Sequence, residues 1–134
     1  MAIPKIQFNS LHSLFSGSSD DLFIEYDDEM DGLCVFMHHP DRPVACYDLN
    51  DSVALLADDR NQVVGFKLAH FVSKCLNTPE LQDFKVTWEQ KDLAREFSHH
   101  RYVNGRQQLS QDGGELVRAL FRRSGRVPRM VEED

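Results

Sequence analysis

The chain has 134 residues, which suits one domain with its own hydrophobic core, and its 41% hydrophobic and 28% charged residues are ordinary values for a globular protein. These values argue against a disordered chain, and no apolar run approaches the ~20 residues that a membrane-spanning helix needs. The N-terminal residues lack a signal-peptide pattern, and Cys34, Cys46 and Cys75 form no CxxC pair. We therefore expect a cytoplasmic protein with reduced thiols and no membrane association.

Charge is distributed unevenly along the chain, whose formal net charge is −7. Residues 1–71 hold twelve acidic against four basic residues, a net charge of −8, and residues 72–134 hold ten against eleven, a net charge of +1. Arginines gather near the C-terminus, and clustered guanidiniums bind carboxylates or phosphates. Because the negative net charge of the chain opposes the approach of nucleic acid, a protein is the expected partner.

The first predicted element is a short helix over residues 3–15, where apolar residues recur on one helical face, and a Ser-Gly linker at 16–19 ends it. Five runs rich in β-branched and aromatic residues then predict strands, and turn-forming residues separate them. The connections have only about four to six residues, which suits antiparallel neighbours. The predicted strands are Leu22–Tyr26, Leu33–Met37, Val44–Tyr47, Val53–Ala57 and Val63–His70.

The second half of the chain has helical patterns. The segment Thr78–Glu80 is a typical helix start, and Thr87–Gln90 is a candidate capping box before a second apolar stripe. Residues 84–88 fit either a strand or a helix, and the pattern alone does not decide between them. A last helix is predicted to begin after Asp112–Gly114, with Gly125 as its C-cap.

These elements predict an α+β fold: a short helix, an antiparallel β-meander of about five strands, and two or three helices that pack on the sheet. We expect a single domain over residues 1–134, with the meander at 22–71, a helical part at 78–125 and a flexible tail at 126–134. Short strands leave sheet edges that a second copy of the chain can cover, so that a homodimer is a further expectation.

The acidic segment Asp27–Asp31 lies between two apolar runs and predicts the turn of a β-hairpin. Its acids and Gly32 match the first, third, fifth and sixth positions of a calcium loop, but His38 occupies the twelfth position, where such a loop needs glutamate. The pairs His38–His39 and His99–His100 lack a spacing that directs two imidazoles to one metal. The sequence leaves open a metal site in which the fold brings histidines of the two pairs together.

The chain resembles a known family in the order of three segments, Tyr26–Leu33, Pro43–Val44 and Asp58–Leu68. This order resembles the small bacterial domain-of-unknown-function family numbered 2283. Members of that family have a tyrosine and acids before a strand, then an Asp-rich turn, a hydrophobic pair, a glycine and a final strand. The resemblance covers residues 22–71. It implies a compact β-rich domain without an assigned activity and, because some members lie beside toxin-like genes, an antitoxin or regulatory role toward a partner.

Our main hypothesis is a non-enzymatic protein-binding or regulatory module without a cofactor or metal. In this hypothesis the acidic turns bind a basic partner, and the C-terminal arginines make a second contact or a self-association surface. The candidate partner-binding residues are Asp27, Asp28, Glu29, Asp31, Asp58, Asp59, Arg118, Arg122, Arg123 and Arg126.

Two other hypotheses belong to different functional classes. The first is a metal-dependent hydrolase or nuclease in which acids of the two turns converge with His38 and His39 around a divalent ion. The second is a nucleic-acid binder that uses the C-terminal arginines, whose affinity would fall steeply with added salt. The sequence contains no nucleotide-binding or nucleophile motif that favours an enzyme.

Overall fold

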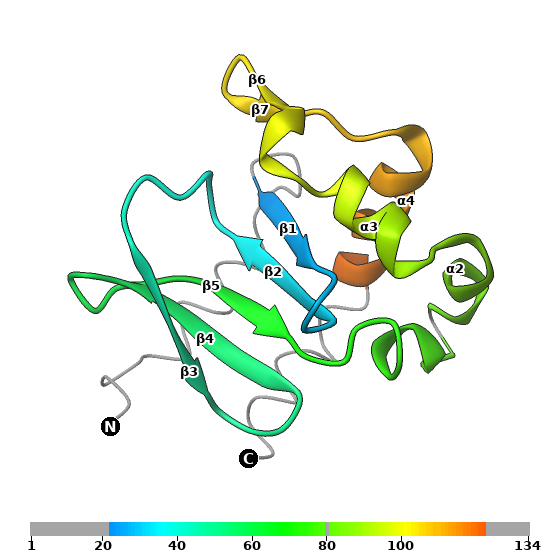
Figure 1. The fold of residues 1–134 in the computed structure, drawn as a ribbon, viewed down its shortest axis with the longest axis horizontal. Helices are drawn as coiled ribbons and strands as arrows, with labels where there is room; N and C mark the ends of the chain where they lie inside the picture. Colours follow the sequence, from blue (N-terminus) through cyan, green and yellow to red (C-terminus); the bar gives the residue numbers. More distant parts are fainter. Residues whose placement is uncertain (1–21, 80, 123–134) are drawn as a thin grey trace.

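The structure is a computed structural model that describes residues 22–79 and 81–122. Its main sheet contains five antiparallel strands in the order β1-β2-β5-β4-β3 (Figure 1). The predicted α+β class is thus confirmed, whereas the predicted N-terminal helix and C-terminal tail lie outside the described residues. The strands are β1 (Phe23–Asp27), β2 (Gly32–Phe36), β3 (Val44–Asp48), β4 (Val53–Asp58) and β5 (Val63–Leu68).

The strand order differs from that of a simple meander, because β2 pairs with β5 and not with β3. One hairpin, β1–β2, therefore lies beside a second antiparallel unit, β3–β4–β5. Gly65 of β5 is opposite Phe36 of β2, and a Cβ atom at Gly65 would overlap the carbonyl oxygen of Val35. The close approach of β5 to β2 thus requires glycine at this position.

The helices of the second half begin and end at other residues than predicted. Residues 84–88, which the pattern left undecided, are mostly helical, since they overlap the C-terminal half of α2. The N-cap of α3 is Glu89, and Asp92 completes its capping box, two residues later than Thr87 and Gln90 would have placed it. The described helical elements are η2 (Cys75–Asn77), α2 (Gln82–Thr87), α3 (Gln90–Glu96), η3 (His99–Arg101) and α4 (Gln111–Arg122).

A small hairpin precedes α4 and was not predicted. Its strands are β6 (Tyr102–Val103) and β7 (Arg106–Gln107). Asn104 and Gly105 have φ angles of 54° and 78° and form the two-residue turn between them. The Asn-Gly pair is the sequence feature that predicts such a turn, although two-residue strands are too short to show alternation.

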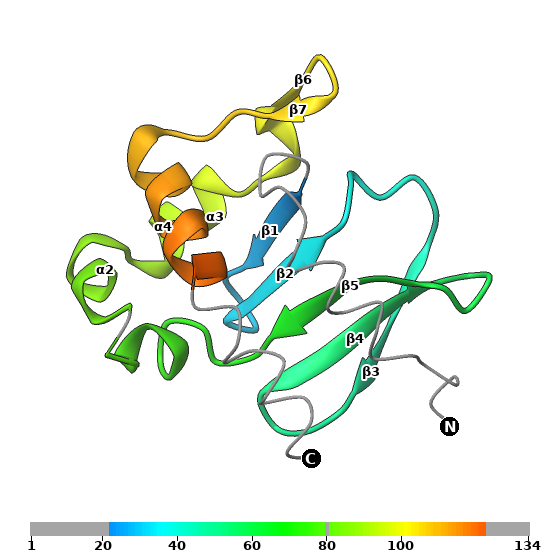
Figure 2. The same ribbon diagram turned by 180° about the vertical axis from the view of Figure 1, so that it is seen from behind.

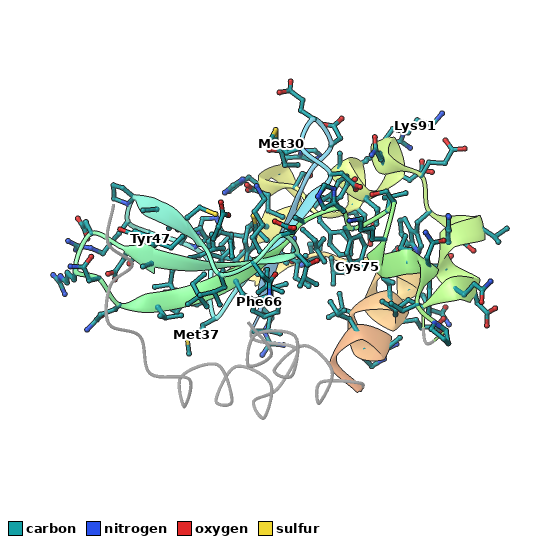
Figure 3. All side chains as sticks on the ribbon, turned by 90° about the horizontal axis from the view of Figure 1, so that it is seen from below. Met30, Met37, Tyr47, Phe66, Cys75 and Lys91 are labelled. Carbon is teal, nitrogen blue, oxygen red and sulfur yellow. The ribbon has the colours of Figure 1, made fainter. Side chains whose placement is uncertain are left out.

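The hydrophobic core lies between one face of the sheet and the helices. Val35, Leu55, Phe71 and Leu93 have no measurable exposure in this core. Figures 1 and 2 show α2, α3 and α4 gathered at the β1 side of the sheet, and β3 lies on the far side in both views. In Figure 3, Tyr47 of β3 and Lys91 of α3 accordingly lie at opposite ends of the molecule.

A smaller cluster of Phe23, Phe36 and Leu56 occupies the other face of the sheet. Tyr102 of β6 packs against this cluster, so that the small hairpin contacts the face that the α-helices leave uncovered. Among the described residues, no helix is long and apolar enough to cross a membrane.

Candidate functional site

The acidic turn between β1 and β2 mainly stabilises its own backbone. Asp27 Oδ1 accepts hydrogen bonds from the backbone N–H groups of Glu29 (3.0 Å) and Met30 (3.3 Å). The predicted hairpin at this position is confirmed, since Asp27 pairs with Gly32 across it. Asp28 and Glu29 are exposed.

Asp31 has a structural role that the sequence pattern did not indicate. Its carboxylate accepts hydrogen bonds from Tyr26 Oη (2.5 Å), Val72 N (2.9 Å), and Ser73 N (3.2 Å) and Oγ (3.1 Å). Burial of the carboxylate by itself would raise the pKa of Asp31, but these hydrogen bonds outweigh it and lower that pKa. Asp31 therefore ties β1 to the segment that follows β5.

Asp58 and Asp59 are adjacent in sequence but differ in their contacts. The Asp58 side chain is nearly buried, and its Oδ1 accepts hydrogen bonds from Arg60 N (2.9 Å) and Gln62 N (3.0 Å) in the β4–β5 turn. Asp59 is exposed and accepts two hydrogen bonds from the Arg42 guanidinium, at 2.6 and 3.0 Å. The hydrogen bond from Arg42 lowers the pKa of Asp59. Each carboxylate thus already has partners within the chain.

The two acidic turns lie at opposite ends of the sheet. The β1–β2 turn adjoins the pair Leu33–Leu68, whereas the β4–β5 turn lies beyond the pair Phe36–Gly65. Carboxylates from the two turns therefore cannot bind one ion together. Within residues 22–79 and 81–122, no group of three or more His, Cys, Asp or Glu side chains could hold a metal.

The fold brings together one histidine from each of the two pairs. His39 and His99 have ring centroids 5.3 Å apart, and His39 stacks on Tyr102 at 4.1 Å. Nδ1 of His99 lies 2.5 Å from Oε2 of Glu25, on the face of the sheet away from the main core. His38 and His100 are exposed and do not take part in this contact. The cluster holds η3 and the small hairpin against β1.

The candidate arginines are only partly described. Arg118 is exposed on α4, and Arg122 is the last residue of that helix. Arg123 and Arg126 lie outside the described residues. Near Arg118 lies a cavity of about 410 Å³ between Leu22, the β6–β7 hairpin and α4, and Arg106 also lines it. Arg106 was not among the candidate residues, because no sequence pattern places β7 beside α4.

One edge of the sheet is closed by the chain itself. Ile24 of β1 donates its backbone N–H to Gln107 Oε1 (3.0 Å) and accepts a hydrogen bond from Gln107 Nε2 (2.6 Å). Tyr26 N donates to the carbonyl oxygen of Phe97 at 3.2 Å. The side-chain amide of Gln107 and the carbonyl of Phe97 therefore bind the backbone groups of β1 with which a further strand would pair.

At the other edge of the sheet, β3 has no partner strand among the described residues. Leu49 N bonds back to Val53 O (2.9 Å) across the β3–β4 hairpin, and because strand groups alternate in direction, the backbone groups of Cys46 point away from β4. The same alternation points the backbone groups of Val44 and Asp48 outward. No other described residue forms a hydrogen bond with these outward groups. We name this row of groups the outer edge of β3.

The surroundings of the outer edge of β3 are acidic. Residues 41–62 hold five acids against two bases, Arg42 and Arg60. Arg42 is already paired with Asp59, so that its charge is locally compensated. Asp41, Asp48 and Asp51, which precede, end and follow β3, are all exposed. The outer edge of β3 therefore has backbone groups without a partner in residues 22–79 and 81–122, and exposed aspartates surround it.

Comparisons with protein-family models, with curated proteins and with solved structures give no match to the chain. The resemblance to the domain-of-unknown-function family therefore stays a prediction, and the function is argued from the geometry of these surfaces.

Proposed function

We propose that the protein is a protein-binding module in which an extended, basic segment of a partner pairs with the outer edge of β3. The observation that carries this proposal is the difference between the two edges of the sheet. Gln107 and Phe97 close the β1 edge, whereas the β3 edge has no partner among the described residues. An open edge binds an extended peptide through main-chain hydrogen bonds.

The charges favour a basic partner over a second copy of the chain. An antiparallel pairing of two β3 strands centred on Cys46 would bring the end of β3 that Asp41 precedes near the end of the other β3 that Asp51 follows. Like charges near each other repel and weaken such a pairing. A partner segment with Lys or Arg beside Asp48 and Asp51 instead gains favourable contacts. The predicted homodimer is therefore the less favoured use of this edge.

Specificity in this mode comes from side chains next to the edge. Cys46 is exposed and small, and the half-buried Val44 and Tyr47 lie on opposite faces of the strand. Main-chain hydrogen bonds supply affinity for any extended segment, while these side chains and the aspartates select its residues. We expect the complex to weaken with added salt, because the aspartates are exposed.

The test compares affinity capture from native lysate by three tagged full-length proteins. Cys46→Pro removes the outward N–H of Cys46 without removing a bond to β4. The charge-reversed variant Asp48→Lys/Asp51→Lys keeps the backbone but reverses the local charge. We expect the wild type to retain a stoichiometric partner that both variants lose, and light scattering of each protein reports any self-association.

The matched control is Asp28→Lys, which reverses an exposed charge in the β1–β2 turn. This variant should capture the partner like the wild type. If Asp28→Lys loses the partner while Cys46→Pro retains it, the acidic turn predicted from the sequence is the binding surface and the outer edge of β3 is not. A regulatory role of the kind that the family resemblance implies further predicts that the captured partner loses activity in the complex.

A further inference from the structure

The cavity beside α4 combines apolar walls with two guanidinium groups. It has a volume of about 410 Å³ and lies between the start of β1, the β6–β7 hairpin and the first two turns of α4. Leu22, Leu109 and Val117 contribute apolar side chains to it, and Gln107, Ser110 and Gln111 contribute polar ones. Arg106 and Arg118 bring positive charge to it from two different elements. Its volume is within the range of small-molecule binding sites, about 300–1,000 Å³.

Arg106 and Arg118 line the cavity for identifiable structural reasons. Arg106 follows the tight turn at Asn104–Gly105, which directs β7 back toward β1. The guanidinium of Arg118 lies over Gly114, one turn earlier in α4, where a Cβ atom would be 3.4 Å from Arg118 Nη1. Helical side chains lean toward the N-terminus of their helix, and this direction brings the Arg118 side chain over the first turn of α4.

Neither guanidinium has an anionic partner among the described residues. In contrast, Arg42 is paired with Asp59, and Arg101 lies 3.7 Å from Glu96 Oε2 and donates to the carbonyl oxygen of Gln108. Arg106 and Arg118 are therefore the cations of the described chain that face a cavity without a carboxylate to neutralise them.

The nearest buried carboxylate is already engaged. Glu96 Oε1 accepts a hydrogen bond from Ser110 N at 2.5 Å, and Arg101 is its cationic neighbour. Ser110 Oγ in turn accepts a hydrogen bond from Gly113 N at 3.0 Å. The backbone N–H groups of Ser110 and Gly113 are thus used within the chain, and the two arginine side chains bring positive charge to the cavity.

We propose that this cavity binds the phosphate monoester group of a small molecule that also has an apolar part. A phosphate monoester is a dianion with three acceptor oxygens, which suits two guanidiniums better than a single carboxylate does. The apolar part of the ligand packs on Leu22, Leu109 and Val117. This site is separate from the outer edge of β3, so that its occupation does not depend on the proposed protein partner.

The experiment is calorimetric titration of the full-length protein with phenyl phosphate, inorganic phosphate, benzoate and succinate. We expect phenyl phosphate to bind most tightly, and Arg106→Gln and Arg118→Gln each to weaken it about tenfold or more, because a charge-assisted hydrogen bond is lost. If both guanidiniums bind one phosphate group, the loss of affinity in the double variant differs from the product of the losses in the two single variants. Arg95→Gln, an exposed arginine on α3, is the matched control and should leave the affinity unchanged.

Four outcomes would overturn the proposal. Absence of phenyl phosphate binding at millimolar concentrations rejects the site. Equal affinity for inorganic phosphate rejects the contribution of the apolar walls, and equal affinity for benzoate or succinate rejects the preference for phosphate. Equal loss of affinity in Arg95→Gln would show that the binding reflects overall charge. Both arginines are exposed and have no ion-pair partner in the described part of the chain, and circular dichroism of each variant checks that its fold is intact.

Discussion

The carboxylate of Glu96 occupies the space that a side chain at Gly113 would need. Glu96, the last residue of α3, is 6% exposed, and a Cβ atom at Gly113 would overlap its Oε1. The absence of a side chain in the first turn of α4 lets this carboxylate accept the backbone hydrogen of Ser110. The two helices are thus joined at their ends by one charged group with defined partners.

Two neighbouring glycines should respond in opposite directions to substitution by alanine. Gly113→Ala displaces Glu96 and should destabilise the protein by about 1–2 kcal/mol. This value is the cost of losing a charge-assisted hydrogen bond, reduced by the higher helix propensity of alanine. At Gly114 a Cβ would make an ordinary contact with Arg118, and Gly114→Ala should stabilise the protein by up to about 1 kcal/mol. Urea denaturation followed by the fluorescence of Trp88 measures both free energies of unfolding.

The double variant Glu96→Ala/Gly113→Ala tests the physical cause of the first effect. If the overlap with Glu96 is responsible, adding Gly113→Ala to Glu96→Ala should cost nothing or stabilise the protein. An equal loss of stability in the presence and absence of Glu96 would contradict this explanation.

The hydrogen bonds of Asp31 predict a pH-dependent contribution to stability. Asp31→Asn removes the charge but tolerates the φ angle of 51° at this position, and it should cost about 1–3 kcal/mol near pH 7. Since folding lowers the pKa of Asp31, its contribution is complete above the ordinary carboxyl pKa of about 4 and is lost as the pH falls through the lower folded value. The stability difference between wild type and variant should therefore shrink in denaturation curves below about pH 4.

Asp28→Asn is the control for this pH dependence. Asp28 belongs to the same turn but is exposed, so that its substitution should change the free energy of unfolding by less than about 0.5 kcal/mol. A difference between wild type and Asp31→Asn that stays constant down to the acid transition would show that the negative charge of Asp31 does not contribute.

The strands could be predicted from the sequence because their pattern is local, whereas their order could not. Turn residues and β-branched runs indicated the five strands. The length of the loop from β2 to β3, however, allows either a hairpin between these two strands or a crossing of β3 to the far edge of the sheet. Gly65 was the available indication, since a glycine inside a strand marks a bulge or a close backbone approach. The open edge of β3 follows from strand order and was therefore beyond prediction.

The sequence indicated acidic candidate surfaces, but it did not indicate where on the fold those surfaces lie. The acids of the turns were expected to face a partner, yet Asp31 and Asp58 bind backbone groups of their own chain. A composition pattern counts carboxylates, but it does not report which of them have partners after folding. The pair His39–His99 and the cavity beside α4 join segments distant in sequence, so that no spacing rule could indicate them.

Gln107 should stabilise the sheet through its two hydrogen bonds to Ile24. Gln107→Ala leaves the backbone N–H and C=O of Ile24 without these partners, and we expect a loss of about 1–2 kcal/mol in the free energy of unfolding. Because the variant also opens the β1 edge, it should aggregate faster on heating. Gln108→Ala, at an exposed neighbouring position, is the control, and equal stability of the two variants would contradict the role of Gln107.

The three cysteines should differ in their reaction with a thiol reagent. Burial raises the pKa of Cys34 and of Cys75 to about 11, so that only a small fraction of either is thiolate near pH 8. Burial also raises the pKa of Cys46, but this side chain is exposed on β3 and accessible to the reagent. We expect iodoacetamide to modify Cys46 first, with the rates at Cys34 and Cys75 rising about tenfold per pH unit below pH 11. Peptide mapping by mass spectrometry gives the order, and modification of Cys34 as fast as that of Cys46 would contradict the protection of Cys34 on β2, between β1 and β5.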